Sequence, residues 1–461
     1  MKDWLKISCL LCVFGFVREI RPSEPYITEY LLGEWRNVTQ DQVNREVYPV
    51  GTYSYLAQLV IVFLITDYLR YKPLIVTIGA TGILIWSMLI WTTSLESLQI
   101  LEFFYGTYMA AEVAYFTYIY AKVDKKYYPR VTSHTRAAMF AGKLVAGISA
   151  QLLINFELMN YKELNYITLA TQIIATCWAL SLPKVDKSLY FHRKEYLTDA
   201  NAISEHNSIR SKDIKFNSSE NGAIDSDDRK SNYSHTSEKL AEFSALQLLW
   251  SHFKNAYTNA KVVQWSIWYA VGLCGYLQIT SYVQVLWKDI EPEPSIAWNG
   301  AVDAVLTALA ALCALAAGYL HAGRFNPRGS LLFLAGLSGL EGGAILMCCL
   351  TTNVYVSYVG FILFGALYAF TITVASAEVA RYLEEDSYGL VFGINTLIAL
   401  ILQTILTLVV ISESGFALNA KGQYTVYGFY FIIIGFVYFI SVVIEYFITR
   451  KSAASNSIAL E

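Results

Sequence analysis

The stretch SEHNSIRSKDIKFNSSENGAIDSDDRKSNYSH, residues 204–235, divides the chain into two hydrophobic parts. It is rich in Ser, Asn, Asp and Lys, and a segment of this composition cannot bury enough apolar surface to offset the entropy lost on ordering. We therefore expect residues 186–260 to form a largely disordered linker. The sequence on either side of it must then carry the folded structure.

The composition of the whole chain is that of a membrane protein. Of its 461 residues, 55% are hydrophobic and 15% are charged, and the mean hydropathy is +0.40. Soluble domains carry about 25% charged residues. The net charge of −3 gives no basic excess for nucleic acid. The seven cysteines lie in apolar stretches and the six histidines are scattered, so we expect neither a disulfide framework nor a metal site.

Twelve apolar segments approach the length of about 20 residues that crosses a bilayer. Six lie on each side of the linker, so residues 1–185 and 261–450 form two halves and residues 451–461 a tail. This layout is that of an all-α membrane protein of the major facilitator type, with twelve transmembrane helices in two six-helix halves and a substrate site between them. The segments span residues 4–22, 52–69, 73–93, 98–121, 136–156, 164–183, 263–286, 296–320, 329–350, 354–380, 388–411 and 424–448.

Lys and Arg gather in alternate loops, as they do on the cytosolic side of membrane proteins. Arg70 and Lys72 follow the second segment, and Arg324 and Arg328 follow the eighth. Both termini and the linker should therefore be cytosolic. The loop after the first segment is then outside, where Asn37 in Asn-Val-Thr is a predicted glycosylation acceptor.

Glu112 is the only charge in AAEVAYFTYIY, residues 110–120. A charge at the bilayer centre costs about 2.5–3.5 kcal/mol on insertion scales. Glu112 lies ten residues before Lys122, or about 15 Å from the cytosolic boundary. Tyr108, Tyr115 and Phe116 share its helical face. A carboxylate framed by aromatic rings suits a flat organic cation.

Lys143 offers another partner for this carboxylate. It lies seven residues, about 10 Å, beyond Arg136 at the cytosolic end of its segment. An extended lysine reaching Glu112 would lower the insertion cost of both groups. The two interpretations are compatible if substrate opens the pair.

Three further acids lie in apolar segments. Asp303, in WNGAVDAV, is deep enough to face a cavity, and Glu341, in SGLEGGA, has either a packing or a ligand role. Glu378 suits an ion pair with Arg381 at the cytosolic rim. Acidic residues deep in the apolar segments therefore outnumber basic ones, which favours a cationic or zwitterionic substrate.

We find no HExxH, GxSxG or Walker motif, so we expect neither an enzyme nor a cofactor.

Several stretches resemble the reduced folate carrier and thiamine transporter family, solute carrier family 19. The resemblance implies a facilitator carrier that takes up thiamine or reduced folates across the plasma membrane without ATP. It covers all twelve segments and is carried by REIRPSEPYITEYLLG (18–33), YPVGTYSYLAQLVIVFLITDYLRYKP (48–73), EFFYGTYMAAEVAYFTYIY (102–120), SYVQVLW (281–287), WNGAVDA (298–304) and LVFGINTLIALILQTI (390–405).

Within this resemblance, Glu112 and Tyr115 match the thiamine members. Folate members carry a lysine where this chain has Gln403 and an arginine where it has Gly365. Glu24 matches a binding acidic residue. The resemblance and the residue pattern together predict a substrate-binding set of Glu24, Tyr48, Glu112, Tyr115, Lys143, Tyr282 and Asp303.

The chain also departs from the family. Gly51 stands where thiamine members have a tryptophan that stacks on the substrate, although Tyr48 is nearby. Lys143 replaces a non-basic residue, Asp303 a glutamate and Glu378 a glutamine. These differences leave open a shifted vitamin specificity or a related organic cation.

Asp67 and Arg70, in TDYLRYKP, resemble the facilitator loop between the second and third helices and are predicted to form a gate. The other interpretation is that Arg70 only fixes the cytosolic side of the helix, as positively charged residues commonly do.

We expect a plasma-membrane carrier that takes up thiamine by alternating access, with a reduced folate carrier as the alternative. A non-transporting receptor on the same fold is a second class of function.

Overall fold

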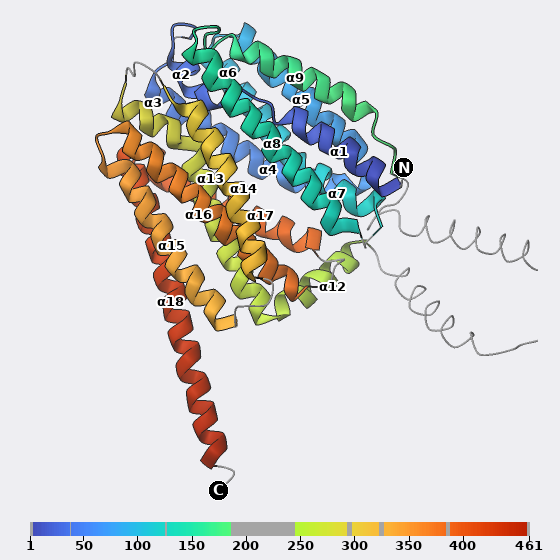
Figure 1. The fold of residues 1–461 in the computed structure, drawn as a ribbon, viewed down its shortest axis with the longest axis vertical. Helices are drawn as coiled ribbons and strands as arrows, with labels where there is room; N and C mark the ends of the chain where they lie inside the picture. The colour runs from blue at the N-terminus through green and yellow to red at the C-terminus, as the bar shows by residue number, and fades with distance from the viewer. Residues whose placement is uncertain are drawn as a thin grey trace, which may run out of the picture.

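The computed structural model describes residues 3–36, 38–124, 127–185, 245–292, 297–321, 327–383 and 388–458. These residues form helices joined by short connections, with no strand among them (Figure 1). In hydrocarbon every backbone N–H and C=O needs a partner within the segment, which a helix provides. The all-α prediction is therefore confirmed.

Each of the twelve predicted segments coincides with a helix, and the fourth with two. The first half contains α1 (Asp3–Arg18), α4 (Tyr48–Tyr68), α5 (Lys72–Trp91), α6 (Leu95–Ala110), α7 (Glu112–Lys122), α8 (Tyr128–Asn155) and α9 (Leu164–Leu180). The second half contains α13 (Ala260–Ile290), α14 (Asn299–His321), α15 (Pro327–Leu350), α16 (Val354–Arg381), α17 (Tyr388–Val410) and α18 (Ala420–Ile458).

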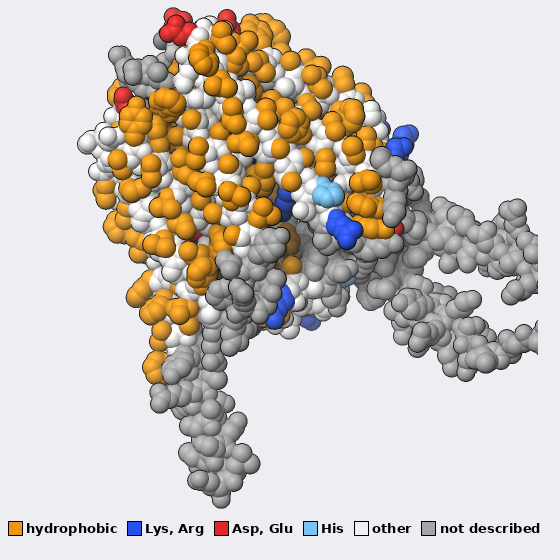
Figure 2. Space-filling model, viewed as in Figure 1, with side chains coloured by type: hydrophobic (Ala, Val, Ile, Leu, Met, Phe, Trp, Pro, Cys, Tyr) orange, Lys and Arg blue, Asp and Glu red, His pale blue; other side chains and the backbone are white. Residues whose placement is uncertain are grey.

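Seven helices in the described part of the chain are long and apolar enough to cross a membrane by length and composition alone. Their outer surface is apolar: large side chains such as Leu312, Leu350 and Ile433 are more than half exposed. Apolar side chains cover much of the face shown in Figure 2. An exposed apolar surface of this extent fits lipid as the solvent.

Side-chain caps mark the starts of three long helices. Ser94 accepts a hydrogen bond from the Ser97 amide at the start of α6. The Asn259 side chain likewise accepts a hydrogen bond from a backbone amide at the start of α13, and the Asn353 side chain accepts one from the Tyr355 amide at the start of α16. Each cap satisfies an amide that the helix leaves without a partner, so these boundaries follow from local sequence.

Each half has its own hydrophobic core. One core is built almost wholly from residues 7–185, and the second from residues 256–438. The halves lie side by side, where α14 packs against α8 and α17 against α4 (Figure 1). Gly147 and Gly300 allow the close approach of α8 and α14, because a Cβ on Gly147 would lie 2.8 Å from the Gly300 carbonyl oxygen.

The halves are joined by hydrogen bonds at one end of the molecule, which we call the α2 end. It contains η1 (Glu24–Tyr26), α2 (Ile27–Leu32), α3 (Gln40–Gln42), η2 (Val43–Val47) and the connections from α13 to α14 and from α17 to α18. The Gln151 side chain accepts from the Tyr26 hydroxyl at 2.8 Å and from the Ala301 amide at 2.9 Å. Lys288 pairs with Glu29 at 2.8 Å. The α2 end is therefore closed in this structure.

Two local predictions need correction. The fourth predicted segment is not one helix, because a turn at Ala111 separates α6 from α7. The expected linker, 186–260, contains the helix α12 (Ala245–Thr258), so the expected disorder does not extend over those residues. Residues 186–244 lie outside the described residues, as does Asn37.

Candidate functional site

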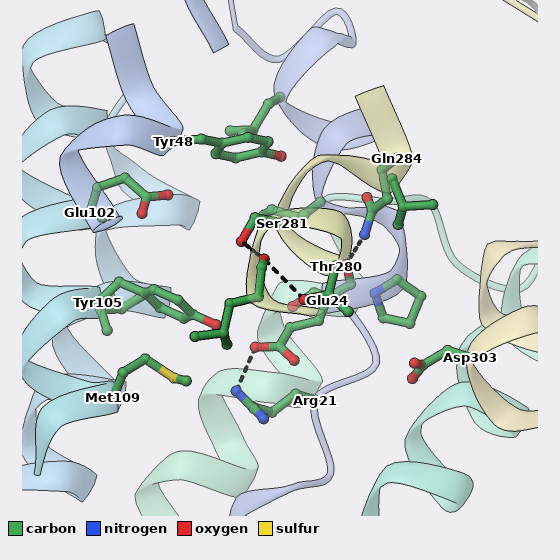
Figure 3. Close-up of a pocket in the computed structure, with 18 of the residues that line it drawn as sticks. Arg21, Glu24, Tyr48, Glu102, Tyr105, Met109, Thr280, Ser281, Gln284 and Asp303 are labelled. Atoms are coloured by element: carbon green, nitrogen blue, oxygen red, sulfur yellow. Dashed lines mark hydrogen bonds and ion pairs between the residues drawn. The ribbon is translucent and has the colours of Figure 1, made fainter. Parts of the chain in front are cut away.

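A cavity of about 430 Å³ lies between the two halves. The first half lines it with α4, α5, α6, α8 and the segment that follows α1, and the second half with α13, α14, α16 and α17. Figure 3 shows part of this lining. A cavity at the interface of two structural halves is where facilitator carriers bind their substrate. The elements that meet there are far apart in the sequence, so only the folded chain assembles this site.

Aromatic side chains make up much of the cavity wall. Tyr48 and Tyr55 come from α4, Tyr105 from α6, Trp86 from α5 and Tyr276 from α13. Tyr48 is held in place by a 2.8 Å hydrogen bond between its hydroxyl and that of Thr28. The wall therefore offers flat apolar faces that suit a planar ring.

Two carboxylates in the cavity wall have no hydrogen bond or ion pair among the described residues. Glu102 of α6 and Asp303 of α14 lie on opposite sides of the cavity (Figure 3). Glu102 extends over Gly51 of α4, where a Cβ would collide with its Oε2. These two groups are free to bind a ligand.

The other charged groups of the cavity are joined in a chain of ion pairs. Arg21 contacts Glu24 at 2.5 Å and Glu19 at 2.7 Å. Lys143 Nζ lies 3.8 Å from Glu19 Oε2. The Lys143–Glu112 pair that the sequence left open does not form in this structure, because Glu19, just after α1, supplies the anion for Lys143 and Arg18 the cation for Glu112.

The charged side chains that line the cavity leave it acidic. Four are carboxylates and two are cations, a net charge of −2 when all are ionised. They are Glu19, Glu24, Glu102, Asp303, Arg21 and Lys143.

Glu112 lies outside the lining of this cavity. Its Oε2 accepts from Arg18 Nη2 at 3.1 Å. Arg18 also donates to the Tyr108 hydroxyl at 3.0 Å, and its Cζ lies 4.6 Å from the centroid of that ring. The aromatic frame around Glu112 thus holds a cation from α1, because Arg18 ends that helix beside the turn at Ala111.

Two more members of the predicted set lie behind the cavity wall. Tyr115 is buried and donates to the Leu11 carbonyl at 2.8 Å. Tyr282 is buried with its ring edge against Tyr48, at a centroid distance of 5.8 Å. The structure thus brings four of the predicted residues together in the cavity: Glu24, Tyr48, Lys143 and Asp303. The other three lie outside its lining: Glu112, Tyr115 and Tyr282.

The remaining predicted residues lie near the ends of the helices. Glu378 is buried 3.8 Å from Arg381, as the sequence suggests. Asp67 is in the last turn of α4, and its side chain is outside the described residues. Arg70 follows in a turn with a positive φ of 57°. The gate that these two residues would form stays a prediction.

Glu102 and Tyr105 are the site residues that the sequence reasoning missed. They lie three residues apart in EFFYG, on one helical face, at the start of the stretch that contains Glu112. The three-residue spacing could have indicated a shared helical face. Glu102, however, lies near the predicted end of its segment, where inserting a charge into the membrane costs little free energy. Arg18 and Glu19 were missed for the same reason.

The chain matches known sequences over most of its length. The family model for the reduced folate carrier matches residues 2–426. Thiamine transporter 1 from Homo sapiens is 37% identical over 459 residues, covering 95% of this chain and 89% of the relative. Reduced folate transporter from Homo sapiens is 32% identical over 450 residues, with 96% and 73% covered. Folate transporter 1 from Caenorhabditis elegans is 33% identical, with 98% and 95% covered.

Solved structures of transporters share the fold. The nucleoside transporter NupG is 14% identical with a TM-score of 0.57, covering 95% of this chain and 99% of that chain. A D-xylose-proton symporter is 9% identical with a TM-score of 0.61, covering 95% and 97%. At these identities the likeness is one of fold alone.

Proposed function

The chain belongs to the reduced folate carrier family, and on this premise we propose that it is a plasma-membrane carrier that takes up thiamine by alternating access. Its termini and linker lie in the cytosol in this proposal, as the distribution of Lys and Arg predicts. The carriers that it resembles include both thiamine and folate transporters by name, so the choice between the two vitamins depends on the cavity.

The observation that carries the choice of thiamine is the pair of free carboxylates, Glu102 and Asp303. Thiamine has a permanently positive thiazolium ring. A carboxylate attracts such a cation strongly in a site that excludes water, because the effective dielectric constant there is far below that of water. The net charge of the cavity lining acts in the same direction.

Aromatic rings near Glu102 supply the second half of the recognition. Tyr105 lies one turn further along α6, and Tyr48 faces the same part of the cavity (Figure 3). A cationic ring stacked on tyrosine gains a cation–π contribution of about 0.5–2 kcal/mol. We therefore place the thiazolium between Glu102 and these two rings. The aminopyrimidine then extends toward Asp303.

A folate would find little to bind its glutamate tail. The two cations of the lining, Arg21 and Lys143, both contact Glu19. Gln403 lines the cavity as a neutral side chain, and Gly365 packs against Leu306. A dianion would have to break existing ion pairs to gain a counter-charge. This arrangement disfavours reduced folates.

The substrate counter-ion in this proposal differs from the one suggested by the sequence. Glu112 is engaged by Arg18, so we assign the thiazolium to Glu102 and keep Glu24, Tyr48, Lys143 and Asp303 as cavity residues. Glu112 and Tyr115 then support the wall from behind. Tyr282 positions Tyr48 through their ring contact.

The closed α2 end represents one state of the transport cycle. With the termini in the cytosol, as the positive-inside pattern supports, this end faces the exterior and the carrier in this proposal is sealed on that side. Rocking of the halves would break the contacts of Gln151 and Lys288 and open the cavity outward.

Uptake of labelled thiamine and labelled methyltetrahydrofolate by cells that express the chain tests the proposal. We expect saturable thiamine uptake that excess unlabelled thiamine inhibits. Saturable folate uptake without thiamine uptake would establish the folate alternative. Thiamine binding without exchange of labelled for unlabelled vitamin would instead indicate a receptor.

A further inference from the structure

Glu341 is an acidic residue buried in the second half, outside the lining of the cavity. It lies in the middle of α15 and its exposed fraction is 0%. Its Oε1 is 2.7 Å from Thr371 Oγ1 on α16, and its Oε2 has no hydrogen-bond partner among the described residues. A buried carboxyl that lacks a partner for one oxygen is rare in proteins.

The hydrogen bond to Thr371 bears on the charge of Glu341. Thr371 Oγ1 also lies 3.0 Å from the Tyr368 carbonyl and 3.1 Å from the Leu367 carbonyl of its own helix. A hydroxyl has one proton to donate. If Thr371 donates to a backbone carbonyl, Glu341 must supply the proton of the bond between them. If it donates to Glu341, an ionised carboxylate would depend on one neutral donor.

The helices around Glu341 offer no ion pair to it in the described structure. On α16 the nearby titratable group is Tyr368, whose buried hydroxyl also has no hydrogen-bond partner within the described part of the chain. The next acid on α16, Glu378, lies two turns beyond Thr371 and is 3.8 Å from Arg381. An ionised carboxylate buried without a cation is far more costly than a neutral acid.

The other two neighbours of this part of α15 are neutral. On α13, the Trp268 indole donates to Ser338, one turn before Glu341. On α18, Gly428 and Ile432 lie against Gly342. Each helix packed against this part of α15 therefore favours the protonated form of Glu341.

Glu341 is linked to the cavity through stacked rings. Tyr368, one turn before Thr371, stacks on Tyr276 with a centroid distance of 4.2 Å and an interplanar angle of 8°. Tyr276 lines the cavity, as does Phe361 of α16. Tyr368 and Tyr276 therefore connect the part of α16 that holds Thr371 to the cavity wall by direct packing.

We propose that Glu341 is a proton-binding site, and that the proton it binds is a coupling ion of transport. In the conformer with the closed α2 end, Glu341 is a neutral acid that joins α15 to α16 through Thr371. In the opposite conformer the contact loosens, water reaches the carboxyl, and the proton leaves to that water as Glu341 ionises. This role rests on the proposed carrier function, but proton binding itself requires no substrate.

Infrared difference spectroscopy of the purified full-length carrier in lipid vesicles tests proton binding without any vitamin. The spectra compare mildly acidic with alkaline buffer. We expect the carbonyl band of protonated carboxylic acids to change with pH in the native protein, and the component of this change that belongs to Glu341 to be absent from Glu341→Gln. Glu378→Gln, which alters a paired carboxyl in the same half, should retain it. A pH difference band in Glu341→Gln that is identical to the native one would overturn the proposal.

Transport supplies the second readout, with whichever vitamin the native chain carries. Coupling energies between sites typically change affinity by about fivefold or more. We expect a pH gradient to change the native net uptake by about fivefold or more, and Glu341→Gln to lose this response while it still exchanges labelled for unlabelled vitamin. Glu378→Gln should respond like the native chain. A native-like response of Glu341→Gln would refute the coupling role.

The infrared experiment uses no vitamin, so its result does not depend on the substrate. If the chain did not take up thiamine, only the proposed substrate would be refuted. Since glutamine has the size of a protonated glutamic acid, Glu341→Gln should fold. Thr371→Val provides an independent variant, because it removes the hydroxyl and keeps the volume. We expect it to weaken the pH response of exchange in the same direction as Glu341→Gln, and an unchanged response would count against the proposed link between α15 and α16.

Discussion

Arg18 Nη2 lies 3.1 Å from Glu112 Oε2, and the Arg18 side chain is 1% exposed. The sequence suggests that the Glu112 carboxylate and the Tyr108 ring bind a ligand cation. In the structure they bind the guanidinium of Arg18 instead. Gln172 completes the arrangement, because its amide donates to the Arg18 carbonyl and its oxygen accepts from the Tyr108 hydroxyl. The pair joins α1 to the break between α6 and α7.

This pair predicts that Glu112→Gln destabilises the carrier. The change leaves the buried Arg18 with Glu19, 3.4 Å away, as its remaining carboxylate. The loss should therefore be at most the roughly 3–5 kcal/mol that breaking a buried ion pair costs. Thermal unfolding of the purified protein should show the loss. Arg18→Met combined with Glu112→Leu should recover much of it, since neither charge is then left unpaired. A Glu112→Gln variant as stable as the native chain would contradict the structural role of the pair.

Glu102→Gln should weaken thiamine binding without loss of stability. Hydrogen bonds to charged groups contribute about 1.5–3 kcal/mol, so the KM should rise by about tenfold to a hundredfold. Uptake kinetics with labelled thiamine measure this change. Glu96→Gln, an exposed acid on the same helix, serves as the control. An unchanged KM in Glu102→Gln would exclude this residue as the counter-ion.

Gly51→Ala should also raise the KM, by displacing the Glu102 carboxylate. The added Cβ would overlap the end of the Glu102 side chain, which is flexible enough to move away. The fold should therefore persist while the carboxylate leaves its position over α4. Gly343→Ala is a matched control, because a Cβ there has no neighbour within 4 Å. Equal kinetics for the two alanine variants would show that the position of Glu102 is unimportant.

Glu29→Lys should open the α2 end by placing two like charges in contact across the halves. The Glu29–Lys288 pair is 2.8 Å long and mostly buried, so its loss favours the outward-open state. We expect uptake to fall by about fivefold or more, and Glu29→Lys with Lys288→Glu to restore it. Labelling of a cysteine introduced at Ser281, in the cavity, reports the opening from outside.

The control for this prediction is Glu413→Lys. Glu413 lies 3.9 Å from Arg45 at the same end, but it is 83% exposed. Exposed ion pairs contribute about 0–1 kcal/mol, so this change should leave uptake nearly unaffected. If Glu413→Lys and Glu29→Lys reduced uptake equally, the effect would be due to surface charge and not to the specific contact.

The helices could be predicted closely from the sequence, because lipid demands long apolar segments and those can be counted. The prediction failed where the signal is local and weak. The turn at Ala111 has no Gly or Pro to mark it, and it sets the position of Glu112 at the start of α7. The candidate site was predicted in part: Glu24, Tyr48, Lys143 and Asp303 line the cavity.

The sequence by itself determined the number of apolar segments, their division by the linker and the presence of unusual charges within them. These properties follow from composition along one dimension. Only the tertiary structure decided which charged side chains are free to bind a ligand. Arg18 forms an ion pair with Glu112, and Lys143 forms one with Glu19. In the cavity, Glu102 and Asp303 are the carboxylates without such a pair among the described residues. Charge pairing depends on distances of a few ångströms between distant segments, and those distances exist only once the helices have packed.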